Sequence, residues 1–309
     1  MRAFVFPGQG AQAIGMGKDL ASYYPAAKAV FDEVDDALGQ NLSGLIWGDD
    51  IEALTLTENA QPALMATSLA ALCALQVEGI ALGSASFVAG HSLGEYSALA
   101  AVGAISISDT ARLLRLRGAA MQEAVPVGVG AMAAILGLGF ESVKAVAEAA
   151  SQGEVCEAAN DNDPGQVVVS GHKTAVDRAI YLAKAAGAKR AMLLPVSAPF
   201  HCSLMESAAE RMAVALAEVK IEMPSLPLVA NVCACAVTDT STIRSLLVKQ
   251  VTGSVRWRES VMFLAAEGVT EFWEIGAGKA LSGMIRRVDH TLNCQSVGTP
   301  DDIAKVLAC

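Results

Sequence analysis

Short runs of β-forming residues alternate with helical patterns along the chain, and this alternation limits the fold more than any other feature of the sequence. Arg2 to Phe6 is a predicted strand, Pro25 to Leu38 a predicted helix, and Ser86 to Ala89 a further short strand. Strands that alternate with helices are typical of proteins with a mostly parallel sheet covered by helices. We therefore expect an α/β fold.

The middle of the chain has a pattern of its own. Its strands are predicted at Ala131 to Ile135, Val155 to Ala159, Gln166 to Ser170 and Arg190 to Leu194, and its helices at Glu141 to Ala150 and Lys173 to Ala186. This β-α-β-β-α-β order is that of the ferredoxin-like motif. We therefore predict a small ferredoxin-like domain at 126–195, inserted into a main domain formed by 1–125 and 196–309.

The main domain has further elements on both sides of this insertion. A helix is predicted to start near Ser108, with a serine as its N-cap. Beyond the insertion we expect a helix from about His201 to Val219 and strands at Leu228 to Val232 and Glu271 to Ile275. The main pattern therefore resumes after residue 195.

Composition excludes several classes of function. The chain has 309 residues, 53% of them hydrophobic, and a net charge of −10, so it has no overall attraction for nucleic acid or anionic membrane. The apolar stretch from Pro62 to Leu75 ends at Gln76 before it can span a bilayer, and a buried helix is the better interpretation. The N-terminal residues reach Pro7 too soon for the apolar core of a secretory signal, so we expect none. Seven irregularly spaced cysteines favour reduced thiols over disulfides or a metal site. We expect a soluble cytoplasmic protein.

One motif points to nucleophilic catalysis. Gly90-His91-Ser92-Leu93-Gly94 fits the G-x-S-x-G pattern and lies between a predicted strand and a predicted helix, as a nucleophile elbow requires. A sharp turn of this kind exposes the serine hydroxyl at the end of a helix that favours negative charge. The same five-residue pattern also arises by chance, so the strand and helix around it are what make Ser92 a candidate nucleophile.

A serine hydroxyl needs a neighbouring base, and the chain has four histidines. His91 is the neighbour of Ser92 in the sequence, and its side chain is expected to point away from the nucleophile. His172 fits a surface turn of the small domain. His201 lies where the small domain returns to the main one, and His290 lies near the C-terminus. Position alone leaves His201 and His290 as rivals.

Four motifs in this order resemble the malonyl-CoA:acyl carrier protein transacylase family. They are Gly8-Gln9-Gly10-Ala11-Gln12, Gly90-His91-Ser92-Leu93-Gly94-Glu95-Tyr96-Ser97-Ala98, Arg117-Gly118 with Met121-Gln122, and Ala198-Pro199-Phe200-His201. The resemblance extends to Glu274-Ile275-Gly276-Ala277-Gly278-Lys279, where the family usually has a proline in place of Ala277. It implies an α/β-hydrolase-like main domain with a parallel sheet, together with a ferredoxin-like small domain.

The resemblance also implies the roles of individual residues. Ser92 would carry the acyl group, His201 would be the base, and the backbone carbonyl of Gln250 would orient it. The backbone N–H groups of Gln9 and Leu93 would form the oxyanion hole.

Donor recognition follows from the same resemblance. Arg117 would hold the malonyl carboxylate, because a guanidinium can bind a carboxylate through two hydrogen bonds. Asn160 and Asn162 would lie in a small-domain loop that faces the cleft. The carrier-docking prediction rests on charge instead: an acidic chain can attract an acidic carrier only through a local basic patch, which is predicted at Lys189, Arg190, Arg286 and Arg287. The expected partners are malonyl-CoA and acyl carrier protein, in fatty acid biosynthesis, with no cofactor, no metal and a monomeric enzyme.

Three alternatives remain at this point. An ordinary serine hydrolase would use His290 as the base, but the chain lacks an HGGG-type oxyanion loop. A non-catalytic carrier-binding module would have no reason to keep Ser92, His201 and Arg117 together. An acyltransferase for another dicarboxylate, such as methylmalonate, is the nearest of the three.

Overall fold

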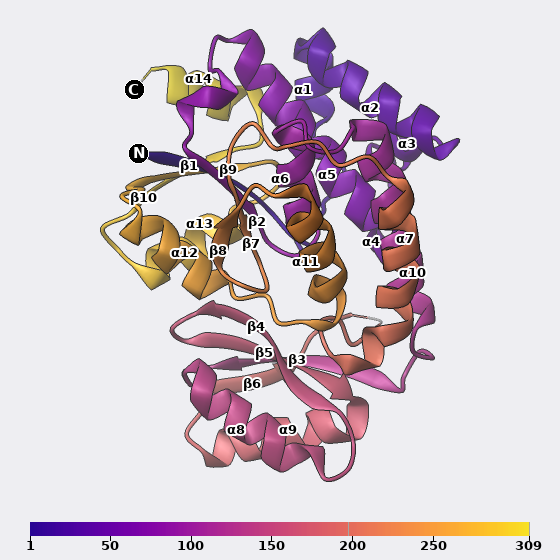
Figure 1. Ribbon diagram of the computed structural model, residues 1–309, viewed down its shortest axis with the longest axis vertical. Coiled ribbons are helices and arrows are strands. Elements are labelled where there is room, and N and C mark those ends of the chain that lie inside the picture. Colours follow the sequence, from indigo (N-terminus) through magenta and orange to yellow (C-terminus); the bar gives the residue numbers. More distant parts are fainter. Residues whose placement is uncertain (197, 309) are drawn as a thin grey trace.

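The computed structural model describes residues 1–196 and 198–308; Ser197 and Cys309, which belong to the predicted main domain, lie outside the described residues. The chain forms a mixed α/β protein with two separate sheets (Figure 1). The strands are β1 (Arg2–Phe6), β2 (Phe87–Gly90), β3 (Gly130–Leu136), β4 (Cys156–Asp163), β5 (Gln166–His172), β6 (Arg190–Leu193), β7 (Leu228–Ala230), β8 (Cys235–Val237), β9 (Glu271–Ile275) and β10 (Asn293–Val297).

The larger sheet has the order β10-β9-β1-β2-β7-β8. All of its neighbouring pairs are parallel except β7 with β8, as the predicted α/β fold requires. Parallel pairing places the carboxyl ends of β1, β2 and β9 at one edge of the sheet, with Phe6 opposite Gly90. Ligands of open α/β sheets bind outside this edge.

Helices cover both faces of the larger sheet. They are α1 (Lys18–Tyr23), α2 (Pro25–Leu38), α3 (Leu42–Ile46), α4 (Ile51–Thr55), α5 (Thr57–Val77), α6 (Gly94–Ala101), α7 (Ile107–Glu123), α10 (Glu206–Glu218), α11 (Thr240–Thr252), α12 (Trp257–Ala266), α13 (Ala280–Val288) and α14 (Pro300–Leu307). Successive side chains of a strand point to opposite faces, so Phe4 joins the core of α2, α5 and α7, whereas Val5 packs with Trp257 and Ile285 on α12 and α13.

The smaller sheet, β4-β5-β3-β6, is antiparallel throughout. Helices α8 (Phe140–Ser151) and α9 (Lys173–Ala185) pack on one face against Ala133 and Ile135. On the other face, Met132 and Ala134 join the core of the larger sheet and its helices, which we call the larger body. In Figure 1 this sheet and its helices form the lower part of the molecule. We call the smaller sheet with α8 and α9 the small body. The face of its sheet that carries Met132 and Ala134 is therefore turned toward the larger body.

Helix α5 is long and apolar enough to meet a length-and-composition test for a membrane span. However, 83% of that window is buried inside the protein. Its environment is that of a core helix, as predicted for Pro62 to Leu75.

Three sequence predictions need correction. Ser106, and not Ser108, caps α7, because its side chain accepts a hydrogen bond from the backbone of Asp109. His201 precedes the short 3₁₀ helix Ser203–Met205 and does not start a helix, since its φ of 59° is left-handed. The segment containing Asn160 is part of strand β4, because it pairs with β5 and forms a parallel bridge to Val255.

Candidate active site

Ser92 lies on a tight turn between strand β2 and helix α6. Its φ of 54° is left-handed, a conformation that costs a residue with a side chain about 1–3 kcal/mol. The flanking glycines make the turn possible: a Cβ on Gly90 would lie 1.9 Å from the carbonyl oxygen of Gly94, and one on Gly94 would lie 2.2 Å from that of Phe6. The turn therefore depends on glycine at both positions, as the sequence motif predicts.

His201 is in hydrogen-bond contact with Ser92. Its Nε2 lies 2.7 Å from Ser92 Oγ, and its Nδ1 lies 2.8 Å from the backbone oxygen of Gln250. A carbonyl accepts only, so Nδ1 carries the proton and Nε2 is free to accept one from the serine hydroxyl. Burial and the nearby Arg117 lower the pKa of His201 to about 3, which keeps the imidazole neutral.

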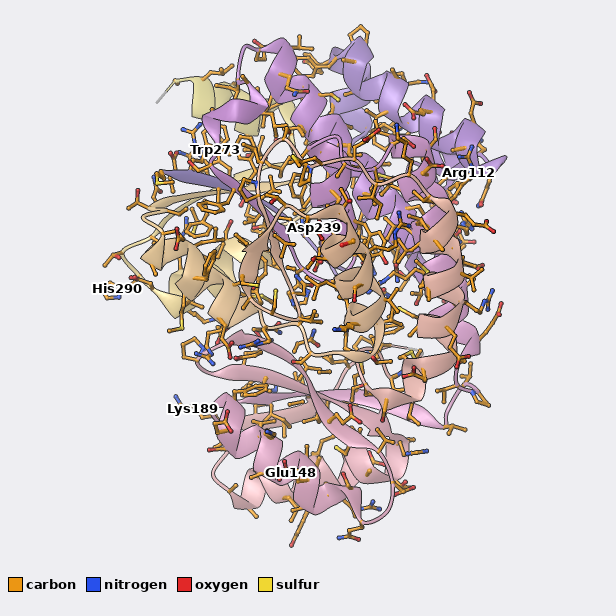
Figure 2. The ribbon with its side chains drawn as sticks, viewed as in Figure 1. Arg112, Glu148, Lys189, Asp239, Trp273 and His290 are labelled. Atoms are coloured by element: carbon orange, nitrogen blue, oxygen red, sulfur yellow. The ribbon has the colours of Figure 1, made fainter. Side chains whose placement is uncertain are left out.

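His290 lies away from this pair. It is exposed at the outer edge of the larger body, beyond the end of α13, and does not line the cavity at Ser92 (Figure 2). The ordinary hydrolase interpretation, which needs His290 next to the serine, is therefore wrong.

Arg117, on α7, is almost fully buried, with 1% of its surface exposed. Nη1 donates to Gln61 Oε1 at 2.9 Å, and Nη2 donates to Gln250 Oε1 at 2.8 Å and to Ser92 Oγ at 3.1 Å. Its Nε, also buried, has no hydrogen-bond partner among the described residues. The guanidinium thus meets the nucleophile directly and still has an unused donor.

Gly118 determines where Arg117 lies. A Cβ at this position would be 2.6 Å from the carbonyl oxygen of Thr57, so only glycine lets α7 approach α5 this closely. The contact places Arg117 beside Gln61 of α5. The Arg117-Gly118 pair of the sequence is therefore one structural unit.

Two backbone N–H groups are available next to Ser92. Within the described residues, those of Gln9 and Leu93 donate to no acceptor. Leu93 follows the nucleophile at the start of α6, and Gly8 brings the Gln9 turn against this segment, because a Cβ there would lie 2.7 Å from the backbone oxygen of His91. Unused donors of this kind are what an oxyanion hole requires.

A cavity of about 430 Å³ surrounds the serine and lies between the two bodies. The larger body contributes most of the polar groups, whereas the small sheet and the segment that follows it contribute apolar side chains together with Asn160. Its lining includes Gln9, Gln61, His91, Ser92, Arg117, Met121, Met132, Asn160, Leu194, Val196, Phe200 and His201. The volume suits a small acyl group with part of its carrier.

Asn160 and Asn162 reach the site from strand β4. Asn160 lines the cavity, and Asn162 Oδ1 lies 2.9 Å from Nε2 of His91. His91 therefore lines the same cavity as Ser92 and connects the two bodies. The alternate residues of this strand face the other way, with Asp161 paired to Arg258 at 2.8 Å.

A buried hydrogen-bond network behind the serine has no counterpart among the sequence predictions. The Asn231 side chain accepts from Ser92 N at 2.8 Å and donates to Gly90 O at 2.7 Å. Glu95 Oε2 accepts from Asn231 N and from Gln250 Nε2, both at 2.9 Å. The available signal was position: Asn231 follows a parallel strand next to β2, and Glu95 lies one helical turn after the nucleophile.

The four basic residues of the predicted docking rim do not line the cavity. Lys189, which is labelled in Figure 2, is exposed just before β6 on the small body, and Arg190, the first residue of β6, is exposed as well. Arg287 pairs with Asp163 at 2.6 Å, whereas Arg286 donates to the backbone oxygen of Cys294 and lines a different cavity.

The chain matches known proteins over almost its whole length. The model of the acyl transferase domain family matches residues 3–299. A malonyl CoA-acyl carrier protein transacylase of Bacillus subtilis is 49% identical over 97% of this chain and 94% of its own. The enzyme of that name from Escherichia coli K12 is 46% identical over 99% of this chain and 98% of its own.

Solved structures of similar proteins point to the same family. An acyl-carrier-protein S-malonyltransferase from Bartonella henselae superimposes with a TM-score of 0.97 and 51% identity, covering 99% of this chain and 98% of its own. A chain from the solved complex of a type II PKS acyl-carrier protein with its malonyl-transacylase gives a TM-score of 0.96 and 43% identity, with 99% of both chains covered. By sequence and by fold, this chain belongs to the malonyl CoA-acyl carrier protein transacylase family.

Proposed function

We propose that this enzyme transfers a malonyl group from malonyl-CoA to the phosphopantetheine thiol of acyl carrier protein, through an ester on Ser92, in fatty acid biosynthesis. The observation that carries the proposal is the contact of Ser92 Oγ with both His201 Nε2, at 2.7 Å, and Arg117 Nη2, at 3.1 Å. It joins an activated nucleophile to a buried cation that suits a donor with a free carboxylate.

The acyl group moves in two balanced half-reactions. His201 takes the proton of Ser92 as Oγ attacks the thioester carbonyl, and the C–S bond then breaks as the imidazolium returns the proton to the coenzyme A sulfur. In the second half, His201 takes a proton from the carrier thiol. The sulfur attacks the ester, and the proton goes back to Ser92 Oγ. The Gln250 carbonyl holds the imidazole in the tautomer that both halves require.

The negative charge on the tetrahedral intermediate needs hydrogen-bond donors. The unused N–H groups of Gln9 and Leu93 are the donors we assign to it. One such donor is typically worth about 2.7–4 kcal/mol of the barrier. Because both are backbone groups fixed by Gly8 and by the start of α6, little rearrangement is needed during the reaction.

Arg117 binds the free carboxylate of malonate in this proposal. Its present acceptors are uncharged oxygens, and a carboxylate forms stronger, charge-assisted bonds with a guanidinium than these do. The unused Nε is a further donor. Asn160 and Asn162 complete the donor-binding wall from the small body.

The fold labels and domain limits belong to the same proposal. We assign 1–125 and 196–309 to an α/β-hydrolase-like catalytic domain, supported by its mostly parallel six-stranded sheet and by the turn at Ser92. We assign 126–195 to a ferredoxin-like domain, supported by the order β3-α8-β4-β5-α9-β6 along the chain.

Carrier docking is proposed at Lys189, Arg190, Arg286 and Arg287, on a monomeric enzyme. A chain with a net charge of −10 needs a local basic surface to attract an acidic carrier. Lys189 packs over Gly137, whose N–H donates to Gly165 next to the Asp163–Arg287 pair, so this side of the small body and the end of α13 are close.

Intact-mass analysis tests the function. The protein is mixed separately with malonyl-CoA, acetyl-CoA and methylmalonyl-CoA, and the adduct is located by peptide mapping. We expect a malonyl adduct on Ser92, its loss in Ser92→Ala, and its transfer to carrier protein. An adduct that still forms at the parental rate in Ser92→Ala, or a preference for methylmalonyl, would reject the proposal in this form.

A further inference from the structure

In the part of the chain that the structure describes, no carboxylate contacts the guanidinium of Arg117 directly. Its hydrogen-bond acceptors among the described residues are Gln61 Oε1, Gln250 Oε1 and Ser92 Oγ, all of which are uncharged. A buried cation is costly unless a negative charge compensates it nearby. In the free enzyme, the compensating negative charge must therefore lie next to a residue that contacts Arg117 and not next to Arg117 itself.

Glu95 is the carboxylate that lies next to such a residue. It is 1% exposed, and its Oε2 accepts from Gln250 Nε2 at 2.9 Å. The other end of the same amide, Gln250 Oε1, accepts from Arg117 Nη2 at 2.8 Å. The amide of Gln250 thus lies between a carboxylate and a guanidinium and is oriented by both.

The other ionisable groups near Glu95 do not carry a competing charge. Tyr96 faces Arg117 as well, but burial raises the pKa of Tyr96 beyond its ordinary range, so its phenol stays protonated. Cys233, on the neighbouring turn, interacts electrostatically with Glu95, and burial raises the pKa of this thiol to about 12. His201 is neutral. Among these groups, Glu95 alone can supply a negative charge to Arg117.

We propose that Glu95 is the counter-charge of Arg117 in the free enzyme, acting through Gln250, and that the carboxylate of the malonyl donor displaces it from this role. The inference rests on the proposed function. With the donor bound, two carboxylates would share one cation in a buried site, and the more deeply placed Glu95 takes up a proton.

The ionisation of Glu95 makes this exchange possible near neutral pH. Burial raises the pKa of Glu95 to about 7, although hydrogen bonds from Asn231 and Gln250 and the charge of Arg117 oppose the rise. A second negative charge at Arg117 raises this pKa further. Donor binding is therefore accompanied by proton uptake, so the affinity for malonyl falls as the pH rises above the pKa of Glu95 in the free enzyme.

The first measurement is the ratio of kcat/KM for malonyl-CoA to that for acetyl-CoA, between about pH 6 and 9. Changes in pH that alter the reactivity of Ser92 and His201 affect both donors equally, so they cancel in the ratio. In the parent enzyme we expect the ratio to fall as the pH rises, by at most about tenfold per pH unit, the limit for a single linked proton.

Glu95→Gln separates charge from hydrogen bonding. The amide oxygen of glutamine can still accept from Asn231 N and Gln250 Nε2, so the geometry is kept while the charge is lost. We expect a ratio that no longer depends on pH and that exceeds the parental ratio at about pH 8 by up to about tenfold. A residue that only supported the fold would change both donors equally at every pH.

Glu274→Gln is the matched control. Glu274 is also fully buried and accepts two hydrogen bonds, from Leu281 N and Ser282 N, but on the far side of the sheet at the start of α13. We expect this variant to lose stability and to keep the parental dependence of the donor ratio on pH.

Proton uptake can be measured without any variant. The parent enzyme is acylated in a weakly buffered solution with a pH indicator, once with malonyl-CoA and once with acetyl-CoA. Both reactions release the same thiol, so we expect extra uptake of a fraction of a proton per acylated Ser92 with malonyl-CoA only. Equal proton changes with both donors, or a parental pH dependence in Glu95→Gln, overturns the inference. Absence of any malonyl ester on Ser92 would instead reject the proposed function.

Discussion

Replacing Arg117 by alanine should change the donor that the enzyme selects. The substitution removes the buried guanidinium that contacts Gln61, Gln250 and Ser92 Oγ. Malonyl then enters a closed cavity with a carboxylate that has lost its water and finds no cation. Acetyl has no such group, so it loses only the contact between Arg117 and the serine.

The contacts give the size of the effect. A charged hydrogen bond contributes roughly 1.5–3 kcal/mol, so two bonds to the malonyl carboxylate amount to about 3–6 kcal/mol. At about 1.4 kcal/mol per factor of ten, kcat/KM for malonyl-CoA should fall by about 10²–10⁴. Acetyl transfer loses one hydrogen bond from the charged guanidinium to Ser92 Oγ, worth roughly 1.5–3 kcal/mol, so its kcat/KM should fall by about 10–10² and by less than that of malonyl-CoA.

The assay compares acylation of Ser92 from the two donors as kcat/KM for parent and variants. Arg117→Lys should recover only part of malonyl transfer, because an ammonium cannot form two parallel bonds with a carboxylate. Arg112→Ala is the matched control: it lies on the same helix, pairs with Asp109 and is exposed on the outer side of the molecule (Figure 2). A malonyl-to-acetyl ratio that stays at the parental value in Arg117→Ala would refute this account of donor choice.

Two further predictions concern the base and the carrier. His201→Ala should lower acylation by about 10²–10⁴, the usual contribution of general base catalysis, whereas the exposed His290→Ala should stay near the parental rate; the reverse order in a stopped-flow acylation assay contradicts the assignment. Lys189→Glu and Arg190→Glu should slow transfer to carrier protein and reduce its dependence on salt, while self-acylation from malonyl-CoA stays unchanged. Equal losses in both half-reactions would speak against docking at these residues.

Local patterns in the sequence identify much of the secondary structure. Strand Arg2–Phe6, helix Pro25–Leu38 and strand Glu271–Ile275 have the predicted limits. The two strands are short apolar runs that end at Pro7 and Gly276, and the helix has apolar residues at helical spacing between Pro25 and Gly39. These features depend only on neighbouring residues. The loop that the resemblance implied at Asn160 is wrong, because this polar segment is made a strand by its partners in β5 and at Val255, which no local pattern reveals.

The candidate nucleophile was also accessible from local sequence. The two glycines around Ser92 encode the turn, since no other residue fits against Phe6 and the start of α6. Local sequence did not distinguish His201 from His290 as the base, and only the family resemblance favoured His201. Distance along the chain explains this: His201 is 109 positions from Ser92, and no local pattern reports a contact of that range.

Only the tertiary structure determines which buried residues contact Ser92 and Arg117. Asn231 meets Ser92 across 139 positions, and Gln250 joins Glu95 across 155 and Arg117 across 133. Each of these residues is ordinary in its own segment and gains its importance from buried polar partners that it must satisfy. Sequence by itself therefore determined the elements and the reactive turn, because these depend on short-range sterics and periodicity. Packing of the two bodies determined which base, cation and buried carboxylate meet there, because burial and electrostatics depend on the whole fold.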